Sequence, residues 1–262
     1  MFCYQCEQTA QGTGCTKVGV CGKDGETAAL QDLLVHACKG IAMYGNRAAK
    51  LGAKDGEVDR FVVEALFTTV TNVNFDSDRL VGWLKEAGHK LGRAKELYEG
   101  ATKSAGSQPE TLAGPAAWRP AADKAGLLAQ AAEVNVETRI NARGGDLSSL
   151  EELITYGLKG TAAYADHARV LGVTDDGVAT FFHEALDFLT TEPGVDELVG
   201  MAMKVGEVNL KVMEMLDEGN TGSYGNPEPT AVRIEPVAGK AILVSGHDLK
   251  DLKKLLEQTE GQ

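Results

Sequence analysis

The chain has 262 residues, a hydrophobic content of 43 % and a formal net charge of −12. This acidic balance excludes the dense Lys/Arg surface that a nucleic-acid-binding protein needs, and no apolar run approaches the roughly 18 residues that a membrane span requires. The first residues lack the charged-then-apolar pattern of a secretion signal. We therefore expect a cytoplasmic protein of one large domain or two ordinary ones, which binds neither nucleic acid nor membrane.

The first predicted element is a cysteine-rich loop over residues 1–26. It begins MFCYQCEQTAQGTGCTKVGVCGK and holds four of the five cysteines, with the spacing Cys3-x2-Cys6-x8-Cys15-x5-Cys21. Clustered cysteines occur in disulfide frameworks, in structural zinc sites and around iron–sulfur clusters. Disulfide frameworks are typical of small secreted domains, and a long chain with one further cysteine does not fit that class.

The spacing favours an iron–sulfur cluster over a zinc ion. Zinc sites usually have two paired knuckles with two to four residues between their ligands, whereas the later gaps of eight and five residues form no second knuckle. A loop around a larger cluster can use one Cys-x2-Cys chelate and then reach the other corners. The positions of Gly12, Gly14, Gly19 and Gly22 permit the positive φ angles that such a loop needs. Four thiolates serve either a [4Fe–4S] or a [2Fe–2S] cluster, and zinc stays the alternative.

Two similar groups of three helices follow the loop. Helical periodicity predicts helices over 27–50, 55–71 and 77–99 in the first group and over 146–170, 175–190 and 195–218 in the second. Ser77 and Asp78 are candidate caps of the third helix. Each group is expected to form a three-helix bundle, the first over 27–100 and the second over 146–219. The connector, 101–145, is rich in Pro and Gly and has a shorter helix near 121–133.

The two groups are an internal duplication. The 37 residues from Leu30 and the 37 residues from Leu150 are identical at fifteen positions, including Lys39/Lys159 and Tyr44/Tyr164. Such a repeat fixes the architecture of a chain. It also assigns Cys38, whose counterpart is Leu158: a position that accepts leucine in the sister unit is a packing position.

The last segment, 220–262, reads differently. The stretch 219–230, GNTGSYGNPEPT, has the composition of a linker. Two short β-type runs follow, AVRIEPV over 231–237 and KAILVSG over 240–246, and then a helix in HDLKDLKKLLEQT. Strand, turn and helix begin an α/β domain, but two strands cannot bury a sheet by themselves. We expect the start of an incomplete α/β domain whose uncovered edge invites pairing with another chain.

Other polar and aromatic candidates have ordinary explanations. His183-Glu184 has the sister pair Val63-Glu64, so the histidine is dispensable to the unit, and salt bridges explain the two glutamates as well as catalysis does. The remaining residues in this class show no partner pattern or fit core packing: His36, His89, His167, Tyr44, Tyr164, Trp83 and Trp118. No phosphate-binding glycine motif is present.

The chain resembles the hybrid cluster protein family, whose members are also called prismane proteins or hydroxylamine reductases. The resemblance is carried by the cysteine loop, by LVHACKGIAMYG, by the duplicated helical unit and by ILVSGHDLKDL. Family members are about twice as long, so the chain is similar to their N-terminal half. The expected fold is therefore mainly α: a loop for the cluster, two duplicated three-helix bundles and the start of a truncated α/β domain.

The resemblance implies two metal sites. Cys3, Cys6, Cys15 and Cys21 match the ligands of a [4Fe–4S] cluster that passes electrons inward. His247, in SGHDL, matches a ligand of the second, hybrid [4Fe–2S–2O] cluster, where catalysis takes place. The family's other ligands to that cluster, two glutamates and four cysteines, lie downstream and have no counterpart here. On residues alone, His247 sits at a strand-to-helix turn with Asp248 as a candidate cap, which is also an ordinary surface position.

The implied activity is reduction of hydroxylamine to ammonia or of nitric oxide to nitrous oxide. Electrons would enter at the N-terminal cluster from a small reductase protein, and a missing C-terminal half would complete the enzyme. Two hypotheses from other classes stay open: a stand-alone one-cluster electron carrier and a zinc-binding interaction module.

Overall fold

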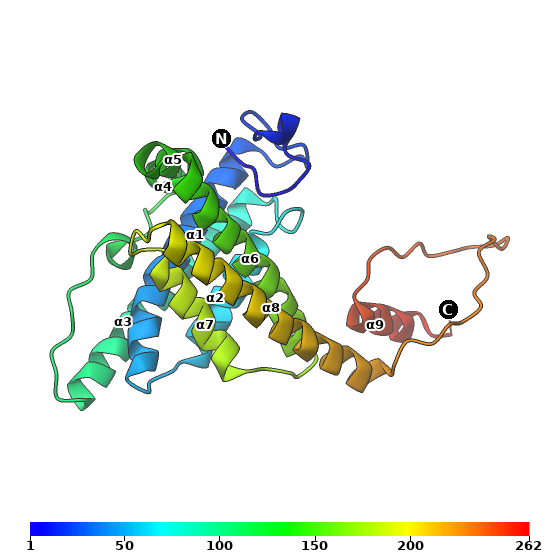
Figure 1. Ribbon diagram of the computed structural model, residues 1–262. Helices are drawn as coiled ribbons and strands as arrows, with labels where there is room; N and C mark the ends of the chain where they lie inside the picture. Colours follow the sequence, from blue (N-terminus) through cyan, green and yellow to red (C-terminus); the bar gives the residue numbers. More distant parts are fainter. Residues whose placement is uncertain (262) are drawn as a thin grey trace.

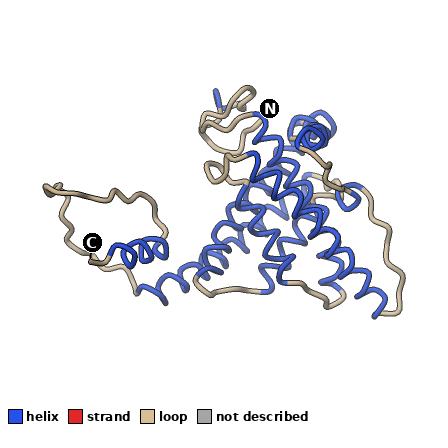
Figure 2. Tube along the Cα trace, turned by 180° about the vertical axis from the view of Figure 1, so that it is seen from behind, coloured by secondary structure: helices blue, strands red, loops and turns tan. Residues whose placement is uncertain are grey.

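The computed structural model describes residues 1–261, and within them the chain is mainly helical with no β-strand (Figures 1 and 2). The first group is α1 (Gly25–Lys50), α2 (Gly56–Thr68) and α3 (Ser77–Ser104), and the second is α6 (Gly145–Val170), α7 (Asp176–Phe188) and α8 (Val195–Tyr224). The other helices are α4 (Lys124–Val134), α5 (Val136–Arg143) and α9 (Leu249–Thr259). The predicted mainly α fold is confirmed. None of the helices in residues 1–261 combines the length and the apolar character that crossing a bilayer requires.

Aspartates set the starts of most helices. Asp24 and Asp55 cap α1 and α2 by accepting hydrogen bonds from backbone N–H groups of the first turn. The cap of α3 is Asp76, which accepts from Asp78 N and Arg79 N at 2.9 and 3.1 Å. The expectation that Ser77 or Asp78 caps α3 is therefore wrong by one or two residues, because a cap lies just outside the helix and both of these residues lie inside it.

The second helix of each group packs most extensively on the first helix of the other group. α1 lies along α3 and α6 along α8, while α2 packs on α6 and α7 packs on α1. One continuous core results, and it includes Phe61 and Val62 of α2 together with Phe181 and Phe182 of α7. The packing is reciprocal, because the second helix of each duplicated group, α2 or α7, contacts the first helix of the other group, α6 or α1; we call this arrangement the helix exchange. The domain boundaries drawn from the sequence stay a prediction.

Helix α8 extends into the predicted linker. It continues to Tyr224, and Gly225 ends it with a φ of 80°. Asn220 and Thr221, which suggested a linker, donate from their side chains to the carbonyl oxygens of Leu216 and Asp217, one turn back in the same helix. These bonds let polar residues stay helical. Helix α5, in the connector, was not predicted at all.

The two predicted strands do not form. Residues 231–246 have no regular structure, and Ile234 and Leu243 are 92 % and 96 % exposed. A strand needs the N–H and C=O groups of a neighbouring strand. Within residues 1–261 the only β-type backbone pairing is the isolated bridge between Cys3 and Cys15. The helix expected after them is present as α9, and Asp248 caps it by accepting from Asp251 N at 3.1 Å.

Candidate metal centre

The cysteine loop folds back on itself at the N-terminal end of the molecule (Figure 1). Cys3 and Cys15 face each other in an isolated antiparallel bridge, with Cys3 N donating to Cys15 O at 3.0 Å and Cys15 N donating to Cys3 O at 2.8 Å. The Thr9 hydroxyl donates to Cys3 O at 3.0 Å, and Thr9 N donates to Cys6 O at 3.2 Å. Three of the four predicted ligands are thus tied into one hydrogen-bonded unit.

Two glycines make the loop sterically feasible. Gly14 has a φ of +144°, and a Cβ there would lie 2.6 Å from the Phe2 ring. A Cβ on Gly19 would lie 3.0 Å from Cys21 Sγ. The missing side chains leave room for the Phe2 ring and for the fourth sulfur, which is the close backbone approach that the sequence indicated.

Replacing Gly14 by alanine is expected to lower the free energy of unfolding by about 1–2 kcal/mol, because it combines an unfavourable φ with the clash on Phe2. Thermal unfolding followed by circular dichroism measures the change. Gly82→Ala is the control: Gly82 is exposed within α3 and a Cβ there meets no atom within 4 Å. That variant is expected to gain roughly 0.5–1 kcal/mol. Equal stability of the two variants would contradict the steric argument.

The sulfurs of the loop have different surroundings. Cys15 is only 4 % exposed, and Ala10 N donates to its Sγ at 3.4 Å while the Thr9 hydroxyl lies 3.6 Å away. The Ala10 N–H holds the pKa of the Cys15 thiol below its ordinary value. Burial raises the pKa of the Cys3 thiol. Cys6 and Cys21 are half-buried.

The four cysteines are the donor set that an iron–sulfur cluster uses, with thiolates distributed over several irons. Across residues 1–261, no three His, Cys, Asp or Glu side chains converge on one metal-ion position. The N–H group directed at Cys15 Sγ is also the kind of donor that stabilises cluster-bound sulfur.

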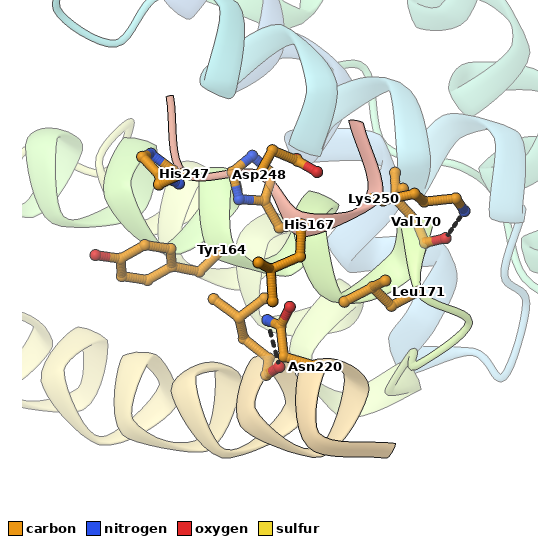
Figure 3. Close-up of a pocket in the computed structure, with 10 residues that line it drawn as sticks. Tyr164, His167, Val170, Leu171, Asn220, His247, Asp248 and Lys250 are labelled. Atoms are coloured by element: carbon orange, nitrogen blue, oxygen red, sulfur yellow. Dashed lines mark hydrogen bonds between the residues drawn. The ribbon is translucent and has the colours of Figure 1, made fainter. Parts of the chain in front are cut away.

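His247 lies at the other predicted site, just before α9 (Figure 3). It borders a cavity of about 350 Å³ formed by α6, by the end of α8 and by the start of α9. The centroids of the His247 and His167 rings lie 6.3 Å apart. Lys250 Nζ, at the start of α9, donates to Val170 O at the end of α6. His167 was not predicted to lie near His247, because the residues around it do not indicate a contact with a residue eighty positions later. His247 itself is exposed.

The profile of the Prismane/CO dehydrogenase family matches residues 1–262. The chain belongs to this family. It is 52 % identical over 262 residues to the hydroxylamine reductase of Rhodospirillum rubrum, 53 % over 266 residues to that of Burkholderia lata and 51 % over 267 residues to that of Acidithiobacillus ferrooxidans. Each match covers all of this chain and 48 % of the relative, so the chain spans about half the length of the curated relatives it matches. The resemblance drawn from the motifs is confirmed.

Helix α6 lies beside both predicted sites of this prismane-family chain. On the loop side, Lys159 Nζ donates to Gln5 Oε1 at 3.2 Å, and the Tyr156 ring packs edge-on against Tyr4 with centroids 6.0 Å apart. On the other side, His167 faces His247. Lys159 and His167 are eight residues apart, which is about 12 Å along a helix at 1.5 Å per residue. One rigid element therefore spans the distance between the two positions.

A buried group of charged residues lies beneath the loop and was not foreseen. Glu152, 2 % exposed, pairs with Arg139 of α5, and Glu151 pairs with Arg143 at 3.0 Å. The sister lysines Lys39 and Lys159 are also buried, and burial lowers the pKa of each to about 8. The sequence signal for these buried charges was the recurrence of a lysine at the same position of two otherwise apolar helix faces. A buried charge is stable only when paired, so the two ion pairs hold α5 against α6.

The other candidates lie in ion pairs, in the core or at the surface, and Tyr164 is exposed and not packed in the core. His183 is buried with Nε2 2.8 Å from Asp59 Oδ1, Glu184 pairs with Lys204, and Glu64 pairs with Arg60 and Arg169. Cys38 lies in the core, and burial raises the pKa of its thiol to about 12. Burial lowers the pKa of His36 to about 4. Two of the remaining aromatic side chains pack on other rings, Trp83 on Phe61 and Tyr44 on Tyr98. Trp118 is buried and His89 is exposed. Tyr164 borders the cavity beside His247.

Proposed function

We propose that this chain is the electron-entry half of a cytoplasmic oxidoreductase that acts on a small nitrogenous compound, hydroxylamine or nitric oxide. The observation that carries the proposal is the folded cysteine loop, with an N–H group already directed at Cys15 Sγ, in a chain that matches the N-terminal half of proteins named hydroxylamine reductase. Because the chain spans 48 % of those relatives, the reaction is proposed for the whole protein.

Cys3, Cys6, Cys15 and Cys21 would hold the iron–sulfur group, which we propose is [4Fe–4S], with [2Fe–2S] as the alternative. When bound, such a cluster supplies a centre that accepts and releases single electrons. The chain's contribution is to set the electrostatics around that centre. The Ala10 N–H stabilises negative charge on Cys15 Sγ, and a donor of this kind raises a reduction potential.

The outer face of the loop gives a redox partner access. Val18 and Val20 are 57 % and 61 % exposed and flank Gly19, next to the half-buried Cys21. Small, partly apolar contacts are typical of short-lived electron-transfer encounters. We propose a small reductase protein as the donor at this surface.

His247 is proposed as a ligand of the hybrid [4Fe–2S–2O] cluster of the complete enzyme. The other ligands implied by the family resemblance are two glutamates and four cysteines further along the sequences of family members. Reduction of hydroxylamine to ammonia and water takes two electrons and two protons, and reduction of two nitric oxide molecules to nitrous oxide and water takes the same number. Either reaction needs a supply of single electrons, which is the role proposed for the loop.

Iron and acid-labile sulfide analysis, with electron paramagnetic resonance of the reduced protein, tests the proposal. We expect brown protein with about four irons per chain, because four thiolates hold one cubane. We also expect little or no hydroxylamine reduction by the chain alone. Colourless protein with one zinc would favour the interaction module, and a reversible cluster in a chain that no half-enzyme partner activates would favour the stand-alone carrier.

A further inference from the structure

Of the two sister lysines, Lys159 contacts the cysteine loop, which also contains a buried lysine of its own, Lys23. Lys159, 4 % exposed, reaches out of α6 so that its Nζ donates to Gln5 Oε1, between Cys3 and Cys6, and lies 5.5 Å from the centre of the Tyr156 ring. Gln5 in turn donates to Thr69 O at 3.3 Å. The ammonium is thus held from two sides directly beneath the loop.

The charge of Lys159 lies next to the cysteine loop. Its Nζ is one hydrogen bond from Gln5, which lies between the predicted ligands Cys3 and Cys6, and the buried ammonium of Lys23, bonded to Gln31, is a second cation in the same region. At neutral pH Lys159 is still a cation, because burial lowers its pKa only to about 8. Water cannot screen a charge in this position as it screens a surface charge.

We propose that the buried ammonium of Lys159 is a positioning charge that raises the reduction potential of the iron–sulfur group held by the cysteine loop. The inference rests on the proposed function and adds the residue that tunes it. A reduced cluster carries one more negative charge than an oxidised one, so a fixed positive charge beside it stabilises the reduced form. The residue transfers no electron and binds no iron.

The duplication provides a matched control. Lys39 occupies the equivalent position of α1, is 8 % exposed and also has a pKa of about 8. Both lysines lie within reach of the carboxylates Glu152 and Asp32, so the difference between them is the hydrogen bond from Lys159 to Gln5 of the loop. Removing either lysine deletes one buried cation, but only Lys159 touches the loop.

The experiment is a redox titration of the iron-loaded chain at pH 7, monitored by electron paramagnetic resonance, for wild type, Lys159→Met and Lys39→Met. We expect Lys159→Met to lower the ratio of reduced to oxidised cluster at a given potential about tenfold, the effect of a unit charge roughly 10 Å away at an effective dielectric constant of about 20. For a one-electron couple this is a midpoint about 59 mV lower. Lys39→Met is expected to shift the ratio by less than about threefold, because the hydrogen bond to the loop belongs to Lys159.

Two further variants separate charge from anchoring. Lys159→Arg keeps the charge and is expected to restore the wild-type potential, and Gln5→Leu removes the hydrogen bond while leaving the ammonium in place. If Lys159→Met does not take up iron, Lys159→Gln, which is neutral but keeps a polar end, replaces it. An unchanged potential in the neutral variant, or an equal shift in Lys39→Met or Gln5→Leu, overturns the inference. Absence of iron and sulfide from wild-type protein is a different result, and it overturns the proposed function instead.

Discussion

Replacing Cys15 and Cys21 together by serine is expected to abolish iron and sulfide binding by the chain. Cys15 is the sulfur that accepts the Ala10 N–H, and Cys21 is the sulfur for which Gly19 leaves room. Serine is a poor ligand for iron that sulfur normally holds, and two thiolates cannot hold a four-iron cluster. Iron per chain, sulfide per chain and the visible absorption spectrum measure the outcome, with a fall from about four irons to well below one.

Cys38→Ala is the matched control for the cysteine prediction. Cys38 is fully buried in the apolar core of the helices, and its sister residue is Leu158. The variant is expected to keep its full iron content and to lose only about 1 kcal/mol of stability from the removed sulfur. Retained iron and colour in the double-serine variant, or loss of both in Cys38→Ala, would remove the basis of the proposed metal site.

Local features of the fold were accessible from the sequence because short-range physics decides them. The duplication and the helical periodicity gave the helices, and Asp248 was identified as a cap because a cap is read from its own residue type and the helix that follows. The same logic placed Cys38 in the core. The linker prediction was wrong because it used composition alone: Asn220 and Thr221 indicated a linker, yet their side chains bond to the preceding turn of α8.

Long-range contacts were not accessible, because periodicity says that a face is buried and not what covers it. Nothing in α2 or α7 marks them as exchanged between the two groups. The pairing of His247 with His167 across the cavity has the same origin. The burial of Lys39 and Lys159 could be predicted only in part. Their recurrence was visible in the sequence, but a lysine is ordinarily exposed, and only the fold shows that both are buried.

Replacing Gly45 by alanine is expected to destabilise the protein by about 3 kcal/mol, because the helix exchange leaves no room for a methyl group there. Gly45 lies on α1 where α7 crosses it, and a Cβ at this position would lie 2.5 Å from His183 Nδ1. His183 is 2 % exposed and held by Asp59, so its ring cannot move aside without losing that bond. Thermal or urea unfolding monitored by circular dichroism measures the loss.

The sister positions provide the test of cause. In the second copy the counterpart of Gly45 is the larger Ala165 and the counterpart of His183 is the smaller Val63, and these two residues border one cavity between α6 and α2. The double variant Gly45→Ala/His183→Val therefore rebuilds at α1 and α7 the combination that α6 and α2 already use. We expect it to recover about 1–2 kcal/mol relative to the sum of the two single changes. Additive losses would mean that α1 and α7 do not meet at these residues, and the exchanged packing of the duplicated helices would lose its main support.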